Sequence, residues 1–303
     1  MSVALERLAC LAGRSAHVSE LSGGLTNRNL HVTCTDGREP AEVVVRCWYG
    51  DAALLGIDRH AEAHNTAAAA AAGVGPELIE HRPDLGMLVI GWIPARTLTD
   101  ADFTDDGVLL RAAEAVRRLH GGPRFRGDFD MFARRAAYVR TISDRGYRLP
   151  EGYLDHEGDW QRLRRALGAR PTGTVPCNND LLAANFLDDG DRAWLIDYEY
   201  SGNNDPCFEL GNTATECGFS DEMTEAYVEA YFGHVEPTSL ARVRLQALAS
   251  AYGWSLWGFI QAAASPLDFD FWSWGMERLD KARSRFADPG FSLLLDTAAG
   301  VRP

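Results

Sequence analysis

Residues 175–212 read VPCNNDLLAANFLDDGDRAWLIDYEYSGNNDPCFELGN, and this segment guides the interpretation of the whole chain. It begins with a short apolar run that meets a polar turn carrying Asp180, and Asn185 follows five residues later. A charged turn comes next, and a β-forming run, residues 193–196, then leads directly into Asp197. Apolar runs separated by turn residues predict a strand, a turn and a second strand. This arrangement places the three polar side chains at loop or strand ends.

Two carboxylates and one amide oxygen on a single hairpin form a set of hard oxygen ligands that suits Mg²⁺. Phosphoryl transfer uses such a set, because one carboxylate orients the attacking hydroxyl while an Asn and an Asp hold metal on the phosphates. The competing interpretation is a polar loop on an ordinary α/β protein. The segment taken alone leaves both interpretations open.

A Gly-Gly turn joins two predicted strands near the N-terminus, within the sequence LSGGLTN at residues 21–27. Glycines allow backbone N–H groups to approach a phosphate closely, and neighbouring hydroxyl and amide side chains add donors. Most turns of this kind are simple hairpins, so the turn by itself is a weak signal. The residues that could contact a nucleotide here are Ser22, Gly23, Gly24, Thr26 and Asn27.

A strongly β-forming run, residues 42–48, carries a single cation, Arg46, among apolar neighbours. A charge in such a strand needs a partner if it is buried. The helix predicted for residues 58–72 follows in the sequence and supplies an acidic residue, Glu62. The alternative is an exposed arginine on an edge strand.

The rest of the chain is predicted to be mainly helical. Residues 1–14 resemble a short amphipathic helix, and strands are expected at 77–81 and 86–93. No Ser-rich or Pro-rich linker marks a boundary, so the two parts should pack together around a cleft near Pro94. Further helices are expected near residues 105–120, 129–141, 157–168, 205–217, 221–232 and 238–263.

In combination, the motifs LSGGLTN, CNNDLLAANFL, LIDYEYSGNN and FELGN resemble those of the choline/ethanolamine kinase family, which is akin to aminoglycoside phosphotransferases and distantly to protein kinases. The resemblance implies a two-lobed α+β fold of the protein-kinase type. It implies a small antiparallel β-sheet lobe that binds nucleotide, residues 1–93. The larger, mainly helical lobe, residues 94–303, would hold the catalytic and substrate-binding residues.

The same resemblance implies roles for individual residues. Asp180 would be the catalytic base, and Asn185 and Asp197 would be metal ligands. Arg46 would grip the nucleotide phosphates and pair with Glu62. ATP and Mg²⁺ are therefore the expected cofactors.

The chain departs from the family pattern at two positions. Asn178 stands where the family has His, a support for the loop, and Glu209 stands where it has Asp. A catalytically weak protein that binds nucleotide or choline without turnover is therefore an alternative hypothesis.

Aromatic residues concentrate near the C-terminus, and Trp254 and Trp257 are i, i+3 neighbours on a predicted helix. The plain interpretation is a hydrophobic core. The resemblance instead implies that these two residues and Trp274 line a choline pocket, with Glu216 as a nearby counter-charge and Glu199 near the metal or substrate. Cation–π attraction would contribute about 1–2 kcal/mol per desolvated ring.

Composition narrows the possible partners. The chain has 303 residues, 46% of them hydrophobic and 24% charged, with a net charge of −13. This charge argues against nucleic acid and anionic lipid and suits a cationic substrate. The six cysteines lack C-x-x-C spacing, so neither a zinc site nor a redox pair is expected. Neither a leader nor a membrane-spanning run is recognised, so a cytoplasmic location is expected.

The predicted function is transfer of the ATP γ-phosphate to the hydroxyl of a small amino alcohol, with choline as the first candidate. Three Trp residues favour a trimethylammonium, whereas a smaller ammonium needs hydrogen-bond acceptors. Ethanolamine, an amino sugar or an aminoglycoside remain alternative acceptors. The sequence does not indicate an oligomeric state.

Overall fold

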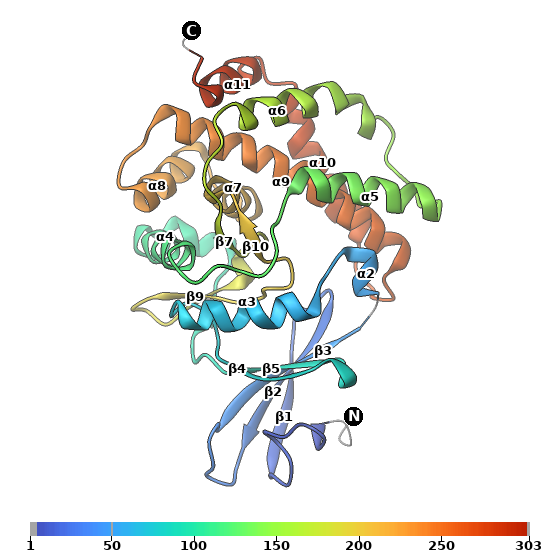
Figure 1. The fold of residues 1–303 in the computed structure, drawn as a ribbon, viewed down its shortest axis with the longest axis vertical. Coiled ribbons are helices and arrows are strands. Elements are labelled where there is room, and N and C mark those ends of the chain that lie inside the picture. Colours follow the sequence, from blue (N-terminus) through green and yellow to red (C-terminus); the bar gives the residue numbers. More distant parts are fainter. Residues whose placement is uncertain (1–4, 50, 302–303) are drawn as a thin grey trace.

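The computed structural model describes residues 5–49 and 51–301. Figure 1 shows a β-sheet at one end of the molecule and a bundle of helices at the other, with helix α3 between them. The sheet has five strands in the order β1-β2-β3-β5-β4, and every neighbouring pair is antiparallel. The strands are β1 Ala16–Leu21, β2 Asn27–Cys34, β3 Glu42–Trp48, β4 Leu78–Arg82 and β5 Met87–Gly91.

Along the central strands, every second side chain points to the same face of the sheet, and this face is buried. Leu30 and Val32 of β2 and Val43 and Val45 of β3 are almost completely buried in one cluster. Helix α3, Arg59–Ala71, starts at an Asp58 cap whose carboxylate accepts two backbone N–H groups. The strand–turn–strand and helix predictions for this part of the chain are confirmed.

The helix predicted for residues 1–14 falls partly on residues 1–4, which lie outside the described residues; Leu5 is helical, but residues 6–13 form successive turns instead of continuing an amphipathic helix. Their backbone N–H groups bond three residues back, as from Leu8 to Leu5 and from Leu11 to Leu8. Leucines spaced by three suit a turn of three residues, which directs Leu8 and Leu11 into the sheet core. Tertiary packing against the sheet therefore decided the local conformation.

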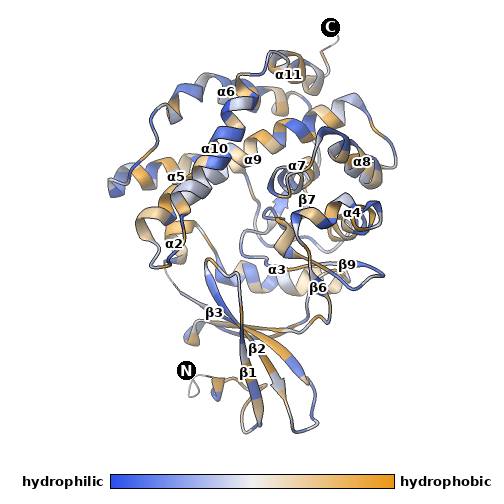
Figure 2. Cartoon of the chain, turned by 180° about the vertical axis from the view of Figure 1, so that it is seen from behind, coloured by the Kyte–Doolittle hydropathy of each residue, from blue (hydrophilic) through white to orange (hydrophobic). Residues whose placement is uncertain are grey.

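The helical part is built around α9, Pro237–Ala264, which packs against α5, α7, α10 and α11. Most of its residues are buried, whereas α10 has few buried positions and shows long hydrophilic stretches in Figure 2. The other helices whose bounds the structure describes are α2 Ala52–Leu55, α4 Asp106–His120, α5 Met131–Arg145, α6 Glu157–Ala169, α7 Pro206–Glu216, α8 Asp221–Phe232, α10 Phe271–Phe286 and α11 Phe291–Ala299.

Two small sheets carry the central motif. β7 pairs with β10, and β8 lies between β6 and β9, all antiparallel. These strands are β6 Arg96–Thr97, β7 Val175–Cys177, β8 Phe186–Asp188, β9 Ala193–Leu195 and β10 Gly202–Asn204. The predicted α+β class, with an N-terminal antiparallel sheet and a helical C-terminal part, is confirmed. Among the helices within 5–49 and 51–301, none has both the length and the apolar character needed to cross a bilayer.

Candidate active site

A single cleft of about 720 Å³ is lined by residues of the sheet and of the helical part. Of the predicted site residues, only Glu62 does not line this cleft. Glu62 instead forms an ion pair with Arg46, which does line it. The predicted residues that line the cleft are Ser22, Gly23, Gly24, Thr26, Asn27, Arg46, Asp180, Asn185, Asp197, Glu199, Glu216, Trp254, Trp257 and Trp274.

The loop that carries Asp180 is held in an unusual backbone conformation. Asn179 has φ 69°, in the left-handed region that Asn tolerates better than most residues. Its side-chain amide donates to the backbone oxygens of Cys177, Tyr200 and Gly202, at 3.1, 3.2 and 3.3 Å. These bonds tie the end of β7 to the segment after Asp197, so the two halves of the motif are joined directly through Asn179.

Asn178 supports the same loop from another side. It is fully buried, and its amide nitrogen donates to the carbonyl oxygens of Ile196 and Asp197 at 3.0 and 2.8 Å. Its amide oxygen accepts the backbone N–H of Asp180 at 3.1 Å. The substitution of Asn for the expected His therefore leaves the loop with three hydrogen bonds from this one side chain.

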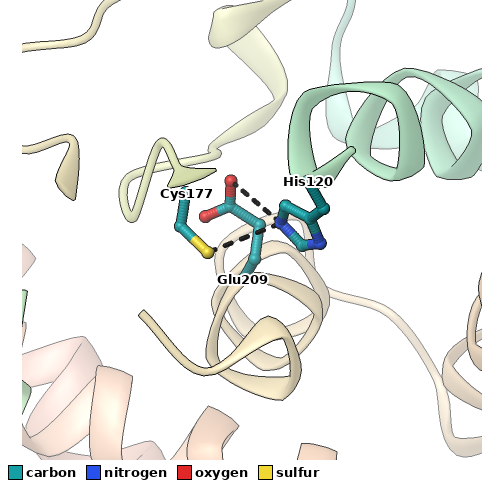
Figure 3. A group of neighbouring side chains, drawn as sticks. All are labelled: His120, Cys177 and Glu209. Carbon is teal, nitrogen blue, oxygen red and sulfur yellow. Dashed lines mark hydrogen bonds and ion pairs between the residues drawn. The ribbon is translucent and has the colours of Figure 1, made fainter. Parts of the chain in front are cut away.

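Glu209 of α7 holds the loop that carries Asp180 in place through hydrogen bonds. Its two carboxylate oxygens accept the backbone N–H groups of Asn178 and Asn179, both at 2.7 Å. Figure 3 shows that His120 and Cys177 lie beside this carboxylate, and His120 Nε2 is 3.9 Å from Glu209 Oε1 and 3.5 Å from Cys177 Sγ. These three residues could form a ligand set for a metal ion, but the two N–H bonds of Glu209 make a structural tether the better description.

Asn185 and Asp197 present oxygens suited to a hard cation. Asn185 ends a 3-10 turn, and its amide nitrogen donates to the backbone oxygen of Asp180 at 2.7 Å. This orientation makes Oδ1 of Asn185 the atom available to a ligand. Asp197 has φ 65°, and its carboxylate lines the same cleft. An amide oxygen and a carboxylate fit Mg²⁺ by their chemistry.

The environment of Asp180 strengthens it as a proton acceptor. Burial raises the pKa of Asp180 well above its ordinary value, and the carboxylates of Glu216, Asp197 and Glu199 act in the same direction. The guanidinium of Arg278 opposes this shift. A general base works best when its pKa approaches the working pH, so the direction suits proton transfer.

Arg46 lies at the centre of a buried charge cluster. Its strand, β3, has a partner on each side, so the alternative of an exposed arginine on an edge strand is wrong. Nη2 of Arg46 is 2.7 Å from Asp197 Oδ1, and Nε is 3.4 Å from Glu62 Oε1. Burial alone would lower the pKa of Arg46, but the carboxylates of Asp197, Glu62 and Glu199 outweigh it and raise that pKa.

Glu199 connects the Gly-rich turn to the helical part. It accepts hydrogen bonds from Thr26 Oγ1 at 2.8 Å and from Asn27 Nδ2 at 2.9 Å. Arg59, which the sequence interpretation overlooked, bonds both Glu199 at 3.1 Å and Glu62 at 2.8 Å. The i, i+3 spacing of Arg59 and Glu62 was the sequence signal that could have identified Arg59 as part of this cluster. Burial, followed by the nearby Asp197 charge, raises the pKa of Glu199 to about 7.

The turn itself depends on its glycines. Gly23 has φ 100°, a conformation that side chains disfavour. A Cβ atom at Gly24 would collide with the backbone oxygen of Asn27, 2.0 Å away. Tyr49 OH donates to the backbone oxygen of Gly24 at 3.1 Å, which holds the turn over the cleft.

The opposite end of the cleft is aromatic. The rings of Trp257 and Trp274 are 5.0 Å apart at 56°, and those of Tyr200 and Trp254 are 4.8 Å apart at 67°. Trp257 Nε1 donates to the hydroxyl of Tyr200 at 2.8 Å. Three of the predicted residues therefore share one aromatic wall, and Tyr200 joins them although the sequence interpretation gave it no role.

Glu216 lies at the same end, where it was expected to face a substrate cation. In the structure it already has a partner, because Arg278 Nε is 3.2 Å from Oε1 and Nη2 contacts Oε2. Arg278 was also overlooked, although it lies one helical turn after Trp274 on α10. Recognition of α10 as a helix would have placed both on one face.

The comparisons with known proteins identify the family. The model of the choline/ethanolamine kinase family matches residues 18–283. The chain belongs to this family. A choline/ethanolamine kinase of Homo sapiens is 28% identical, with 89% of this chain and 78% of that protein aligned. A probable ethanolamine kinase of Arabidopsis thaliana is 27% identical, with 84% and 75% aligned.

Solved structures place the fold in the same family. The crystal structure of a choline/ethanolamine kinase family protein from Mesorhizobium loti has a TM-score of 0.85 and 34% identity, over 98% of this chain and 97% of that one. The GDP complex of an aminoglycoside 2′-phosphotransferase has a TM-score of 0.64 at 16% identity, over 97% and 98%, which shows a shared fold. This member of the choline/ethanolamine kinase family is thus a phosphotransferase that acts on an alcohol group, on a kinase-like scaffold.

Proposed function

We propose that this phosphotransferase transfers the γ-phosphate of ATP to the hydroxyl group of choline. The observation that carries the proposal is that Asp180 and the rings of Trp254, Trp257 and Trp274 line one cleft. A quaternary ammonium has no N–H group to donate, and it gains about 2 kcal/mol from a desolvated ring face. Choline combines such a group with a hydroxyl that can reach Asp180.

Asp180, Arg46 and the Gly-rich turn each have a role in this proposal. Asp180 aligns the hydroxyl and accepts its proton, which its raised pKa favours. Arg46, oriented by Glu62, neutralises phosphate charge. The turn at Gly23 and Gly24 covers the phosphates with backbone N–H groups.

Asn185 and Asp197 would hold Mg²⁺. The support is chemical, because an amide oxygen and a carboxylate line the cleft beside Asp180 and are the ligand types that this ion prefers. When bound there, the ion supplies positive charge to the β- and γ-phosphate oxygens. The bond from Asn185 Nδ2 to the Asp180 backbone orients the amide for this role.

Ethanolamine is the second candidate acceptor. Its primary ammonium would need hydrogen-bond acceptors, and Glu216 is a carboxylate at the aromatic end of the cleft. One relative at 27% identity is named a probable ethanolamine kinase. The pairing of Glu216 with Arg278 argues against this acceptor, since each carboxylate oxygen already accepts a hydrogen bond and the negative charge is balanced.

The test is turnover with ATP and Mg²⁺ on choline, ethanolamine and kanamycin, measured side by side. We expect the highest kcat/KM for choline and no turnover by the Asp180→Ala variant. A higher kcat/KM for either of the other acceptors would overturn the choice of choline. Equal ADP release by the wild type and Asp180→Ala would favour a protein that binds these ligands without phosphotransfer.

A further inference from the structure

Arg278 is the one cation at the aromatic end of the cleft to which the proposed reaction gives no role, among the residues described as lining it. Its guanidinium carbon lies 3.3 Å from the ring centroid of Trp274. Nε and Nη2 bond the two carboxylate oxygens of Glu216, and Nη1 donates to the backbone oxygen of Trp274 at 3.3 Å. The guanidinium is therefore fixed from three sides.

The pair of Arg278 and Glu216 is well shielded from water. The side chains are 12% and 3% exposed, and a two-pronged arginine–carboxylate contact is among the strongest charged hydrogen bonds. Removing one member of a buried pair leaves an uncompensated charge, so the contact resists opening. The charge of Glu216 is consequently cancelled inside the protein before any substrate arrives.

Stacking on Trp274 gives Arg278 a second effect. The guanidinium covers one face of this ring, while the Trp257 ring lies 5.0 Å from it at 56°. A planar cation held flat on an indole limits rotation of that indole. The orientation of the aromatic wall thus depends on Arg278.

These two effects bear on which ammonium the cleft accepts. A primary ammonium that leaves water must donate its N–H groups to acceptors, and a charged acceptor is the most favourable. A quaternary ammonium donates none and needs only ring faces. A site with an ordered aromatic wall and a carboxylate that is already paired favours the quaternary ion.

We infer that Arg278 is a specificity-determining residue, which pairs with Glu216 and stacks on Trp274 so that the acceptor site takes a quaternary ammonium in preference to a primary one. This inference rests on the proposed function in that the cleft must hold an amino alcohol. It adds that the preference is set by a residue that need not touch the acceptor.

The first test compares Arg278→Met with the wild type by kcat/KM on choline and on ethanolamine. Methionine keeps much of the side-chain length but frees the Glu216 carboxylate for a primary ammonium. We expect the choline-to-ethanolamine ratio to fall at least about tenfold, since one charged hydrogen bond can change an equilibrium by that factor. In Arg278→Met with Glu216→Gln, the gain on ethanolamine should disappear because no free carboxylate remains.

A matched control lies on the same helix. Arg285 is 60% exposed, and its partner Asp221, at 3.7 Å, is equally exposed. Arg285→Met removes the same charge from α10 outside the cleft and should leave the ratio unchanged. An equal change in this control would assign the effect to net charge and overturn the inference.

A second readout does not need turnover. Tetramethylammonium and methylammonium are titrated against tryptophan fluorescence in both proteins, with thermal melting to check folding. The wild type should bind tetramethylammonium more tightly, and Arg278→Met should lose at least about tenfold of that preference. If Arg278→Met does not fold, Arg278→Lys replaces it, because lysine keeps the charge but loses the planar stack on Trp274. Weaker tetramethylammonium binding by Arg278→Lys than by the wild type supports the inference, and unchanged binding overturns it.

The two readouts separate the inference from the proposed function. A wild type that phosphorylates neither acceptor, yet shows the Arg278-dependent preference in binding, would overturn the function and support the inference. Unchanged ratios in turnover and in binding would overturn the inference while leaving choline phosphorylation intact. A gain on ethanolamine that persists after Glu216→Gln would also overturn it, because the freed carboxylate would not be its cause.

Discussion

Asn178→Ala would remove the three hydrogen bonds that one buried side chain makes within the loop that carries Asp180. The lost partners are the backbone oxygens of Ile196 and Asp197 and the backbone N–H of Asp180, at 3.0, 2.8 and 3.1 Å. Each bond contributes about 1 kcal/mol to stability on average, and buried groups left unpaired cost more. We therefore expect the free energy of unfolding to fall by about 3 kcal/mol.

The loss should also appear in catalysis, because the same bonds orient the loop of the proposed base, Asp180, and the backbone of Asp197. Urea unfolding followed by fluorescence would measure the first effect, with a midpoint shift of at least about 1 M for a typical dependence on denaturant. Turnover at saturating ATP would measure the second, and we expect kcat to fall at least about tenfold.

Asn178→His is the informative companion, because it installs the residue that resembles the family pattern. An imidazole can donate to only one of the two carbonyl oxygens at a time when it is neutral. We expect its stability to lie between those of the wild type and Asn178→Ala. An unfolding midpoint and a kcat for Asn178→Ala that both match the wild type would refute the claim that this side chain supports the loop.

Other perturbations test the remaining parts of the site. Asp180→Asn should lower kcat by about 10²–10⁴-fold, measured as product formation, while ATP binding persists. ATP with Mg²⁺ at about 100 times Kd should add about 2.7 kcal/mol to stability in a thermal shift, and EDTA should remove most of it. Gly258→Ala should destabilise the α9–α10 crossing by about 1–3 kcal/mol in urea unfolding, since its Cβ would lie 2.8 Å from Gly275 Cα. The hydrogen bond from Arg111 lowers the pKa of Asp188. The pair therefore stabilises the fold at pH values above 3.8, the ordinary pKa of Asp, and this stabilisation is lost as the pH falls through the lowered pKa. The destabilisation caused by Arg111→Met, measured by urea unfolding, should therefore shrink below about pH 4.

Much of the fold could be predicted because its signals are local. The turn at Gly23 and Gly24, the β-forming run around Arg46 and the hairpin that leads into Asp197 each depend on neighbours in the chain. Turn residues and side-chain periodicity act over a few positions, so they can be recognised without knowledge of the rest. The segment at residues 6–13 was the exception, because packing of its leucines against the sheet outweighed its helical pattern.

Contacts between distant segments were decided only by the tertiary structure. Glu199 bonds Thr26 across more than 170 positions of sequence, and Arg278 reaches Glu216 from a different helix. A buried charge is costly unless it is paired, and its partner is an opposite charge that the packing places nearby, so no local sequence pattern encodes that partner. The residue types for phosphoryl transfer can thus be read along the chain, whereas the pairing of Glu216 with Arg278, which leaves rings in place of a free carboxylate at the aromatic end of the cleft, arises from how α7, α9 and α10 pack together.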